Sequence, residues 1–286
     1  MLDRILEILT ALILTILAVL IGTFSSIVGV GGGFIIIPLL ILVYNLKAHV
    51  AMGTSLTTVL FTAISATIVY LKQRRIDWKL GIITVLLTIP TSYMGAYSTK
   101  FFESKVLSGI FGIALALIGL RMILGSGLLY RRKESDEGTI AKLSSSQKGW
   151  YRKLVDASGS VFEYRIRTIP GFLLLPLCGF VASFLGVAGG IIIVPVYVLV
   201  MKVPIHLATA TSLFTIIFTS ISGAYAHLLL GNISLEYAIP LIIGTVTGAQ
   251  IGTRIAKRLK SKLIQFIFGL LMISVGIFMA VTRLLM

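Results

Sequence analysis

Cysteine, histidine and acidic residues are scarce in this chain. Its 286 residues include one cysteine, three histidines and ten acidic residues. The single cysteine, Cys178, excludes an intramolecular disulfide framework and a multi-cysteine metal or thiol relay. We therefore expect no metal site and no cofactor, and we interpret Cys178 as a small apolar residue at the start of a helix.

The long apolar segments contain no acidic residue near their centres. This distribution argues against cation transport through a buried Asp or Glu and against a carboxylate proton relay. A membrane-embedded enzyme would need an acid–base pair, a nucleophile or a metal set at depth, so the sequence predicts that the protein is not an enzyme. The acidic residues lie in loops or near segment ends: Asp3, Glu7, Asp77, Glu103, Glu134, Asp136, Glu137, Asp156, Glu163 and Glu236.

Long hydrophobic runs dominate what the chain does contain. Hydrophobic residues make up 57% of it and charged residues 12%, which predicts a multi-pass membrane protein. The first run is expected to be a retained helix, because Asp3 and Glu7 stand where a signal peptide has net positive charge. Runs of spanning length or nearly so are Ile5–Val28, His49–Leu71, Leu80–Thr99, Val106–Leu124, Ile205–Leu230, Leu235–Ile255 and Leu263–Met286.

The chain contains an internal repeat. The segment from Gly22 to Leu71 realigns without a gap 157 residues further along, from Gly179 to Leu228. GVGGGFIIIP recurs as GVAGGIIIVP, and HVAMGTSLTT recurs as HLATATSLFT. In membrane proteins, doubled halves of this kind usually enclose a transport path. We divide the chain into a first transmembrane repeat (1–124), a basic connector (125–170) and a second transmembrane repeat (171–286).

The net charge of +15 comes from loops and reports topology rather than nucleic-acid binding. The basic loops are 71–79, 130–167 and 254–262. Lys72–Arg75 aligns with the uncharged Leu229–Asn232, and the basic Arg254 region aligns with the region of Tyr97 and Phe101, so each half is basic where the other is not. Opposite charge bias in two similar halves predicts inverted insertion. We therefore expect an all-α polytopic protein of the cell membrane, built from two inverted repeats, with both termini outside and the connector cytoplasmic.

The second apolar segment of each half is too short to span a membrane. Phe34–Tyr44 and Ile191–Met201 are about 11 residues long, or about 16 Å of helix, against a hydrocarbon core of about 30 Å. Each follows a glycine cluster, which lets the backbone break and turn. Paired breaks of this kind point to a substrate site, although glycines can also serve close helix packing. Because Ala188 replaces Gly31, the second break is expected to be less open.

Neutral polar residues follow both breaks. A half-helix beginning at Gly33 or Gly190 directs backbone N–H groups at the break, and hydroxyls can donate to an oxyanion. The same hydroxyls can instead bond to helical carbonyls or between helices. The candidate substrate-binding residues are Gly32, Gly33, Thr54, Ser55, Gly189, Gly190, Thr211 and Ser212, with Tyr93 and Gln250 at equivalent positions further along.

Histidine is the one residue type here whose ordinary titration falls near neutral pH. His49 and His206 are equivalent and are candidates for proton coupling, or else they anchor helix starts at an interface. His227 aligns with Tyr70 and is expected at the outer interface.

These motifs carry a family resemblance. The glycine-rich break, the aliphatic run with its proline and the His and Thr-Ser segment, all present twice, resemble the TauE/SafE family of sulfite and organosulfonate exporters. The resemblance covers nearly the whole chain except the connector. It implies secondary active transport of a small sulfur-containing oxyanion, with export as the expected direction. The two inverted repeats predict that this transport occurs by alternating access.

Other readings stay open. The alternative is a passive anion channel or a permease for another small anion, and a noncatalytic scaffold would not account for two equivalent breaks.

The expected partners are a small anion, membrane lipids and a coupling ion, either H⁺ or Na⁺, with no nucleic acid. The oligomeric state, the anion and the direction of transport are not determined by the sequence. Within the connector, Ala157–Ser160 between two β-prone runs predicts a short hairpin, interpreted as a linker between the halves, with a cytoplasmic lid or a partner site as the alternative.

Overall fold

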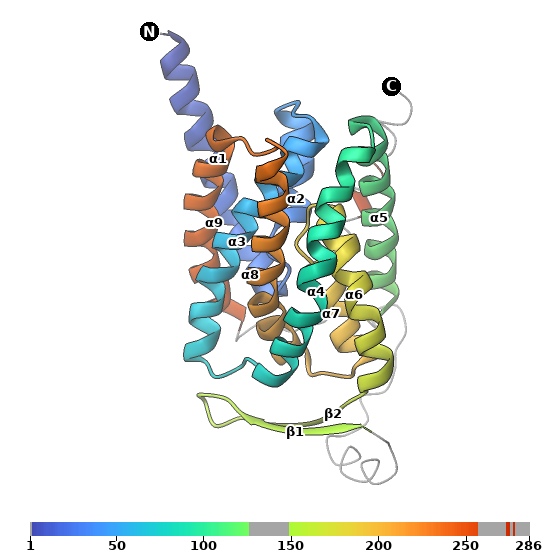
Figure 1. Ribbon diagram of the computed structural model, residues 1–286. Coiled ribbons are helices and arrows are strands. Elements are labelled where there is room, and N and C mark those ends of the chain that lie inside the picture. The colour runs from blue at the N-terminus through green and yellow to red at the C-terminus, as the bar shows by residue number, and fades with distance from the viewer. Residues whose placement is uncertain (1, 126–148, 257–272, 275–276, 278–286) are drawn as a thin grey trace.

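The computed structural model describes residues 2–125, 149–256, 273–274 and 277. The expected span Leu263–Met286 lies almost wholly outside these residues, as do the polar part of the connector and the basic residues after Ala256. The described residues form a helical bundle with a two-stranded sheet across one end (Figure 1).

The helices of the first half follow the predicted apolar runs. They are α1 (Leu2–Val28), α2 (Gly33–Pro38), the π-helical turn η1 (Leu39–Val43), α3 (Ala48–Lys72), α4 (Trp78–Ser98), the 3₁₀ turn η2 (Thr99–Phe101) and α5 (Ser104–Gly125). The described part of the second half repeats this order up to the counterpart of α4, with α6 (Thr168–Phe184), α7 (Gly190–Pro195), the π-helical turn η3 (Val196–Val200), α8 (Ile205–Leu229) and α9 (Leu235–Ile255).

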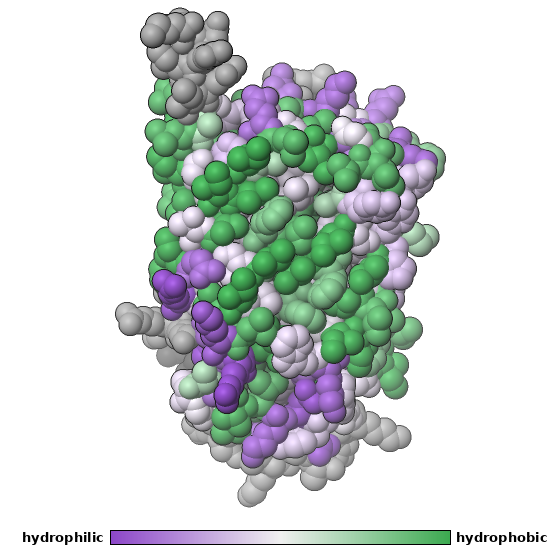
Figure 2. All heavy atoms as spheres, turned by 60° about the vertical axis from the view of Figure 1, so that its left-hand side comes forward, coloured by the Kyte–Doolittle hydropathy of each residue, from purple (hydrophilic) through white to green (hydrophobic). Residues whose placement is uncertain are grey.

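Four described stretches are long and apolar enough to cross a membrane: Leu9–Val28, Ala48–Lys72, Trp78–Phe101 and Ile205–Leu229. Large aliphatic side chains remain exposed along the bundle, including Leu20 on α1 and Leu86 on α4. Figure 2 shows apolar atoms forming a broad band over one face, with hydrophilic atoms gathered above and below it. An exposed apolar band of this kind is suited to lipid contact, so the protein is a multi-pass membrane protein.

The two short segments are half-helices, as their length predicts. Helix α2 and turn η1 together cover Gly33–Val43, and α7 with η3 covers the equivalent Gly190–Val200. Both change from α- to π-helical geometry directly after a proline, Pro38 and Pro195. Proline has no backbone N–H to donate, which favours a local change of hydrogen-bond register at these positions.

The two halves interlock instead of folding side by side. Helix α1 packs along α9, and the equivalent pair α6 and α4 pack together. Glycines allow both approaches, because a Cβ on Gly22 would lie 2.4 Å from the Thr245 carbonyl oxygen and one on Gly179 would lie 2.8 Å from that of Thr88. Each contact is the repeat-shifted copy of the other.

Equivalent helices run in opposite directions in the view of Figure 1. Helix α3 runs from the top of the picture to the bottom, whereas its counterpart α8 runs from bottom to top. Helix α1 likewise begins at the top, and its counterpart α6 begins at the bottom beside β2. The α3 and α8 helices pack against each other in the middle of the bundle.

A β-hairpin lies where the connector pattern predicts one. Strands β1 (Trp150–Val155) and β2 (Val161–Ile166) pair antiparallel, from Trp150 opposite Ile166 to Val155 opposite Val161. The hairpin crosses the end of the bundle at which α3 ends and α4 begins (Figure 1). Its Tyr164 and Ile166 are buried in the same apolar cluster as Leu80 of α4 and Met201.

Candidate functional site

The backbone turns sharply at both glycine-rich breaks. The residue before each half-helix is left-handed, with φ of 93° at Gly32 and 96° at Gly189. Gly31 has φ of 83°, and Ala188, its counterpart, also adopts a left-handed φ of 55°. The two breaks therefore have similar backbone geometry, and the replacement of Gly31 by alanine does not give the second break a different path.

The two breaks lie against each other. A Cβ on Gly33 would come within 3.1 Å of both the Gly186 carbonyl oxygen and the Val187 Cα. A Cβ on Gly190 would lie 2.5 Å from the Cα of Val30. The first residue of each half-helix thus touches the broken backbone of the other half, with no room for a side chain between them.

Ser55 and Ser212 join the two halves at the breaks. The Ser55 hydroxyl donates to the Gly186 carbonyl at 3.1 Å, and the Ser212 hydroxyl donates to the Gly29 carbonyl at 2.8 Å. Both serines are fully buried. These hydrogen bonds satisfy carbonyl groups that the broken helices leave without an intrahelical partner.

Thr54 and Thr211 also act across the halves, but at opposite ends of the bundle. Thr54 Oγ1 accepts a hydrogen bond from the Ser234 N–H, and Thr211 Oγ1 accepts one from the Asp77 N–H, both at 3.0 Å. Ser234 and Asp77 are the N-cap residues of α9 and α4. The structure therefore places these two threonines at helix starts rather than on the break carbonyls.

Buried threonines continue along α3 and α8 at four-residue spacing. Thr58 and Thr62 donate to carbonyls one turn earlier in α3, and Thr215 does the same in α8. Thr219 donates to the Ala188 carbonyl of the second break at 2.9 Å, and Thr62 donates to Thr245 at 2.7 Å. The central helices α3 and α8 thus each carry a row of neutral hydroxyls. The row on α8 contacts the broken backbone through Thr219.

The remaining candidate residues contact other parts of the bundle. Tyr93 is half-buried and stacks on Tyr97, with ring centroids 5.9 Å apart. Gln250 donates through Nε2 to the hydroxyl of Ser65 at 2.9 Å and to its carbonyl at 3.0 Å. Neither side chain has a hydrogen bond to a break residue among the described contacts.

The histidines have different surroundings. His49 Nε2 lies 3.1 Å from the Thr99 carbonyl and 2.9 Å from the Phe102 carbonyl, so it ties the start of α3 to the segment after α4. His206 is half-buried in the first turn of α8, at the hairpin end. His227 is fully buried in the last turn of α8, at the end of the bundle opposite the hairpin.

The structure contains two polar clusters that the sequence did not predict. In the first cluster, the fully buried Tyr197 of η3 donates its hydroxyl hydrogen to Thr84 Oγ1 on α4 at 2.6 Å. The second cluster fastens the hairpin: Arg152 donates from Nη2 and Nε to the two carboxylate oxygens of Asp77, and Tyr164 donates to the same carboxylate. Both clusters join residues far apart in the sequence, so no local spacing indicates them.

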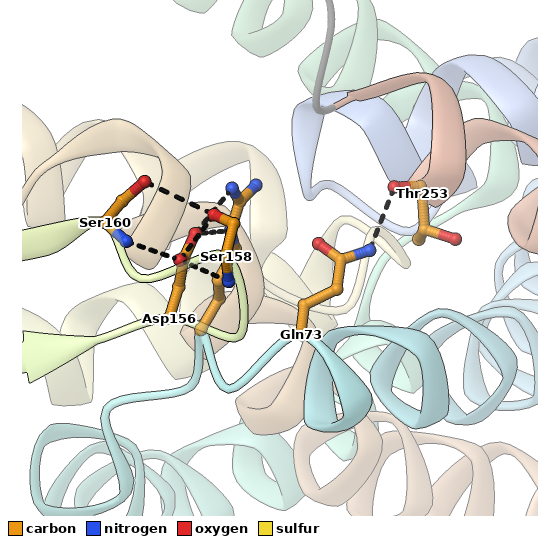
Figure 3. Close-up of polar contacts among 6 residues, drawn as sticks. Gln73, Asp156, Ser158, Ser160 and Thr253 are labelled. Carbon is orange, nitrogen blue, oxygen red and sulfur yellow. Dashed lines mark hydrogen bonds and ion pairs between the residues drawn. The ribbon is translucent and has the colours of Figure 1, made fainter.

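The hairpin turn is fastened to the loop after α3. Arg75 donates to Asp156 Oδ2 at 2.9 Å, and the Ala157 N–H donates to the Gln73 carbonyl at 3.0 Å. In Figure 3, the Gln73 side chain reaches the Thr253 carbonyl, while Ser158 and Ser160 surround Asp156. The loop after α3, the hairpin and the end of α9 are therefore bonded into one polar layer.

Within the described bundle, the buried charged side chains lie at this end. Burial alone would raise the pKa of Asp156, but hydrogen bonds from Ser158, Arg75 and the Ser160 N–H outweigh it and lower that pKa. The hydrogen bond to Asp77 raises the pKa of Arg152. Among the described residues, the buried carboxylates are those of Asp77 and Asp156. The breaks and the threonine rows are thus neutral, which suits an anion better than a cation.

The structure is that of a polytopic membrane protein of the transporter type. Its apolar helices interlock, the backbone breaks at two equivalent positions, and a hairpin covers one end of the bundle. The chain belongs to the TauE/SafE family: it matches the family described as "Sulfite exporter TauE/SafE" over residues 14–279. This family is one of membrane transporters and not a class of enzymes.

Curated relatives cover nearly the same length. The chain is 31% identical over 271 residues to the "Probable membrane transporter protein YunE" of Bacillus subtilis, covering 92% of this chain and 95% of the relative. A probable membrane transporter protein of Methanocaldococcus jannaschii is 24% identical over 282 residues, covering 93% and 94%. No solved structure matches the chain significantly. These similarities support a transport role.

Proposed function

We propose that this protein is a secondary active transporter, and an exporter, of a small sulfur-containing oxyanion such as sulfite or an organosulfonate. The substrate class rests on the description of the family and not on a bound ligand. The observation that carries the mechanism is the direct contact between the two breaks, with Gly33 against Gly186 and Val187 and Gly190 against Val30.

The contact between the breaks has a mechanical consequence. An anion can enter only if the two broken segments separate, because no side chain fits between them in this structure. Separation would free the hydroxyls of Ser55 and Ser212 from the carbonyls that they now bond. Hydroxyls and backbone N–H groups exposed in this way can donate to an oxyanion, so opening and binding are coupled.

Alternating access follows from the reciprocal contacts. The opposite directions of α3 and α8 and the repeat-shifted contacts support an inverted-repeat architecture. In such an architecture the same motion, applied to the other half, opens the opposite side. The basic loops support placing the hairpin end in the cytoplasm, with both termini outside.

Within this mechanism, Gly32, Gly33, Gly189 and Gly190 shape the breaks, and Ser55 and Ser212 supply hydroxyls to the anion. Thr54 and Thr211 hold the starts of α9 and α4, so they act on the position of these helices as the halves move. Tyr93 and Gln250 would meet the anion only after a rearrangement of α4 and α9.

The test is flux in liposomes that contain the purified protein. Uptake of radiolabelled sulfite and sulfoacetate is measured with and without a pH gradient, for the wild type and for a Thr54→Ala, Thr211→Ala double variant. A carrier gives saturable flux and exchange of labelled for unlabelled anion, both reduced in the variant. Unsaturated flux without exchange would favour the passive channel, and no flux of either anion under any gradient would refute the proposed substrate class.

A further inference from the structure

His227 is an unusual residue in this bundle. It lies in the last turn of α8, is fully buried, and neither of its ring nitrogens has a hydrogen-bond partner among the described residues. The hydroxyls of Ser183 on α6 and Ser220 on α8 are also fully buried and unpartnered within the described part of the chain. A buried polar atom without a partner costs about 1–3 kcal/mol, so three such groups call for an explanation.

Ser220 and His227 lie on one face of α8, and Ser183 of α6 lies opposite this face. Ser220, Gly223 and His227 are spaced by three and four residues, which places them one above another on a helix. A Cβ on Gly223 would lie 3.3 Å from Ser183 Oγ, so this face is turned toward α6. The Cβ of His227 also packs against Gly53 of α3, since a Cβ on that glycine would lie 3.0 Å away.

In the first half, the residues equivalent to His227 and Ser183 both have hydrogen-bond partners. Tyr70 is the counterpart of His227, and its hydroxyl donates to the Ser26 carbonyl at 3.2 Å. Ser26 is the counterpart of Ser183, and its hydroxyl donates to the Thr23 carbonyl at 3.0 Å. An imidazole is shorter than a phenol, so the second half lacks the contact that Tyr70 makes. It presents a titratable ring and an unbonded hydroxyl instead.

The charged and titratable surroundings of His227 are sparse. Helices α6 and α8 contain no Asp, Glu, Lys or Arg, and the one such residue of α3, Lys72, is at its opposite end. Glu236 in the first turn of α9 is exposed. His49 at the start of α3 is the described titratable group whose charge acts on the ring. A proton on His227 would therefore be a positive charge in a neutral interior, and an anion between the breaks would favour it.

We propose that His227, together with Ser183, forms the proton-binding site that couples proton movement to anion transport. The inference rests on the proposed function and deepens it. The protonated ring carries an N–H on both nitrogens, and the Ser183 hydroxyl can accept from one of them, whereas Ser220 lies two helical turns away, about 10.5 Å along α8. This assignment differs from the pair His49 and His206, because the Nε2 of His49 is already held by two backbone carbonyls.

The test separates coupling from transport itself. His227→Tyr copies the residue that the first half uses, and His227→Gln removes titration with a smaller change of shape. Both are compared with the wild type and with Tyr70→Phe in liposomes, using radiolabelled sulfoacetate. Two fluxes are measured: accumulation driven by a pH gradient of either sign, and exchange at equal pH on both sides.

The expected result is a loss of about tenfold in gradient-driven accumulation for both His227 variants, with exchange retained. Tyr70→Phe should keep both fluxes. Gradient-driven accumulation equal to that of the wild type would overturn the proposal. Loss of exchange together with accumulation in variants that remain folded would also overturn it, because the ring would then belong to the anion path.

A second measurement does not depend on the substrate. The chain has three histidines, so the imidazole signals of a ¹⁵N-histidine-labelled sample can be assigned with His227→Gln. The proposal expects the His227 ring to take up a proton as the pH is lowered while the protein stays folded. A ring that stays neutral until the protein unfolds would refute it. If the wild type transports neither anion while the ring titrates, the substrate class fails and the proton site stands.

Discussion

Arg152 on the hairpin donates two hydrogen bonds to the carboxylate of Asp77 at the start of α4, at 2.6 and 3.0 Å. The Asp77 side chain is fully buried and that of Arg152 is 18% exposed. This ion pair holds the hairpin across one end of the bundle. The other end has no hairpin among the described residues, so the two ends differ although the two halves are similar. The hairpin therefore covers the end of the bundle where it lies.

Replacing Arg152 by alanine should release the hairpin. The change leaves the Asp77 carboxylate buried without its cation, which costs about 3–5 kcal/mol. Cleavage of the hairpin by a protease should accelerate by more than about 100-fold, because cleavage follows the population of the open form. Lys153→Ala is the matched control, since Lys153 pairs with Glu163 on the exposed face and should change the rate little. Equal rates in the two variants would contradict the account.

Acid should undock the hairpin turn through Asp156. The pKa of Asp156 is lowered in the folded protein. Its ionised carboxylate therefore contributes its full stability above the unfolded-state pKa of about 4, and this contribution is lost as the pH falls from that value toward the folded-state pKa. Fluorescence of Trp150 in a Trp78→Phe background follows docking from pH 7 to acid. Asp156→Asn should remove the part of the change that Asp156 causes. An identical acid profile in that variant would show that Asp156 is not responsible.

The break contacts predict a large effect for one added methyl group. Gly190→Ala would place a Cβ 2.5 Å from the Cα of Val30, so the breaks must move apart or the chain must misfold. Gly159→Ala is the control, because a Cβ there meets nothing within 4 Å and only its left-handed φ opposes the change, at about 1–2 kcal/mol. Thermal unfolding in detergent should separate the two clearly. Equal stability would argue against close contact of the breaks.

Ser55→Ala and Ser212→Ala should have matching effects. Each removes a buried hydrogen bond between a hydroxyl of one half and a break carbonyl of the other, for a loss of about 1 kcal/mol or more. Both variants should also raise the KM for the transported anion. A change in stability without any change in KM would limit these serines to a structural role.

Much of the architecture was predictable because its signals are local. Run length and glycine clusters indicate the half-helices, and turn residues between β-prone runs indicate the hairpin. The partners of Thr54 and Thr211 were not predictable, because they depend on which helix start lies beside them in the fold. The burial of His227 was missed for the same reason, since a residue near a helix end is buried or exposed according to its neighbours. The left-handed backbone of Ala188 was not predictable either, because alanine opposes this conformation and its surroundings impose it.

The most direct test locks the two halves together through their central helices. Leu56→Cys on α3 and Gly223→Cys on α8 are introduced with Cys178→Ala, because a Cβ on Gly223 would lie 3.1 Å from a terminal methyl of Leu56, which the substitution removes. Formation of the disulfide is verified by mass spectrometry, and uptake of radiolabelled sulfoacetate is measured in liposomes before and after reduction. The account predicts no flux in the oxidised protein and restored flux after reduction. Equal flux in both forms would show that the anion passes without separation of the two halves.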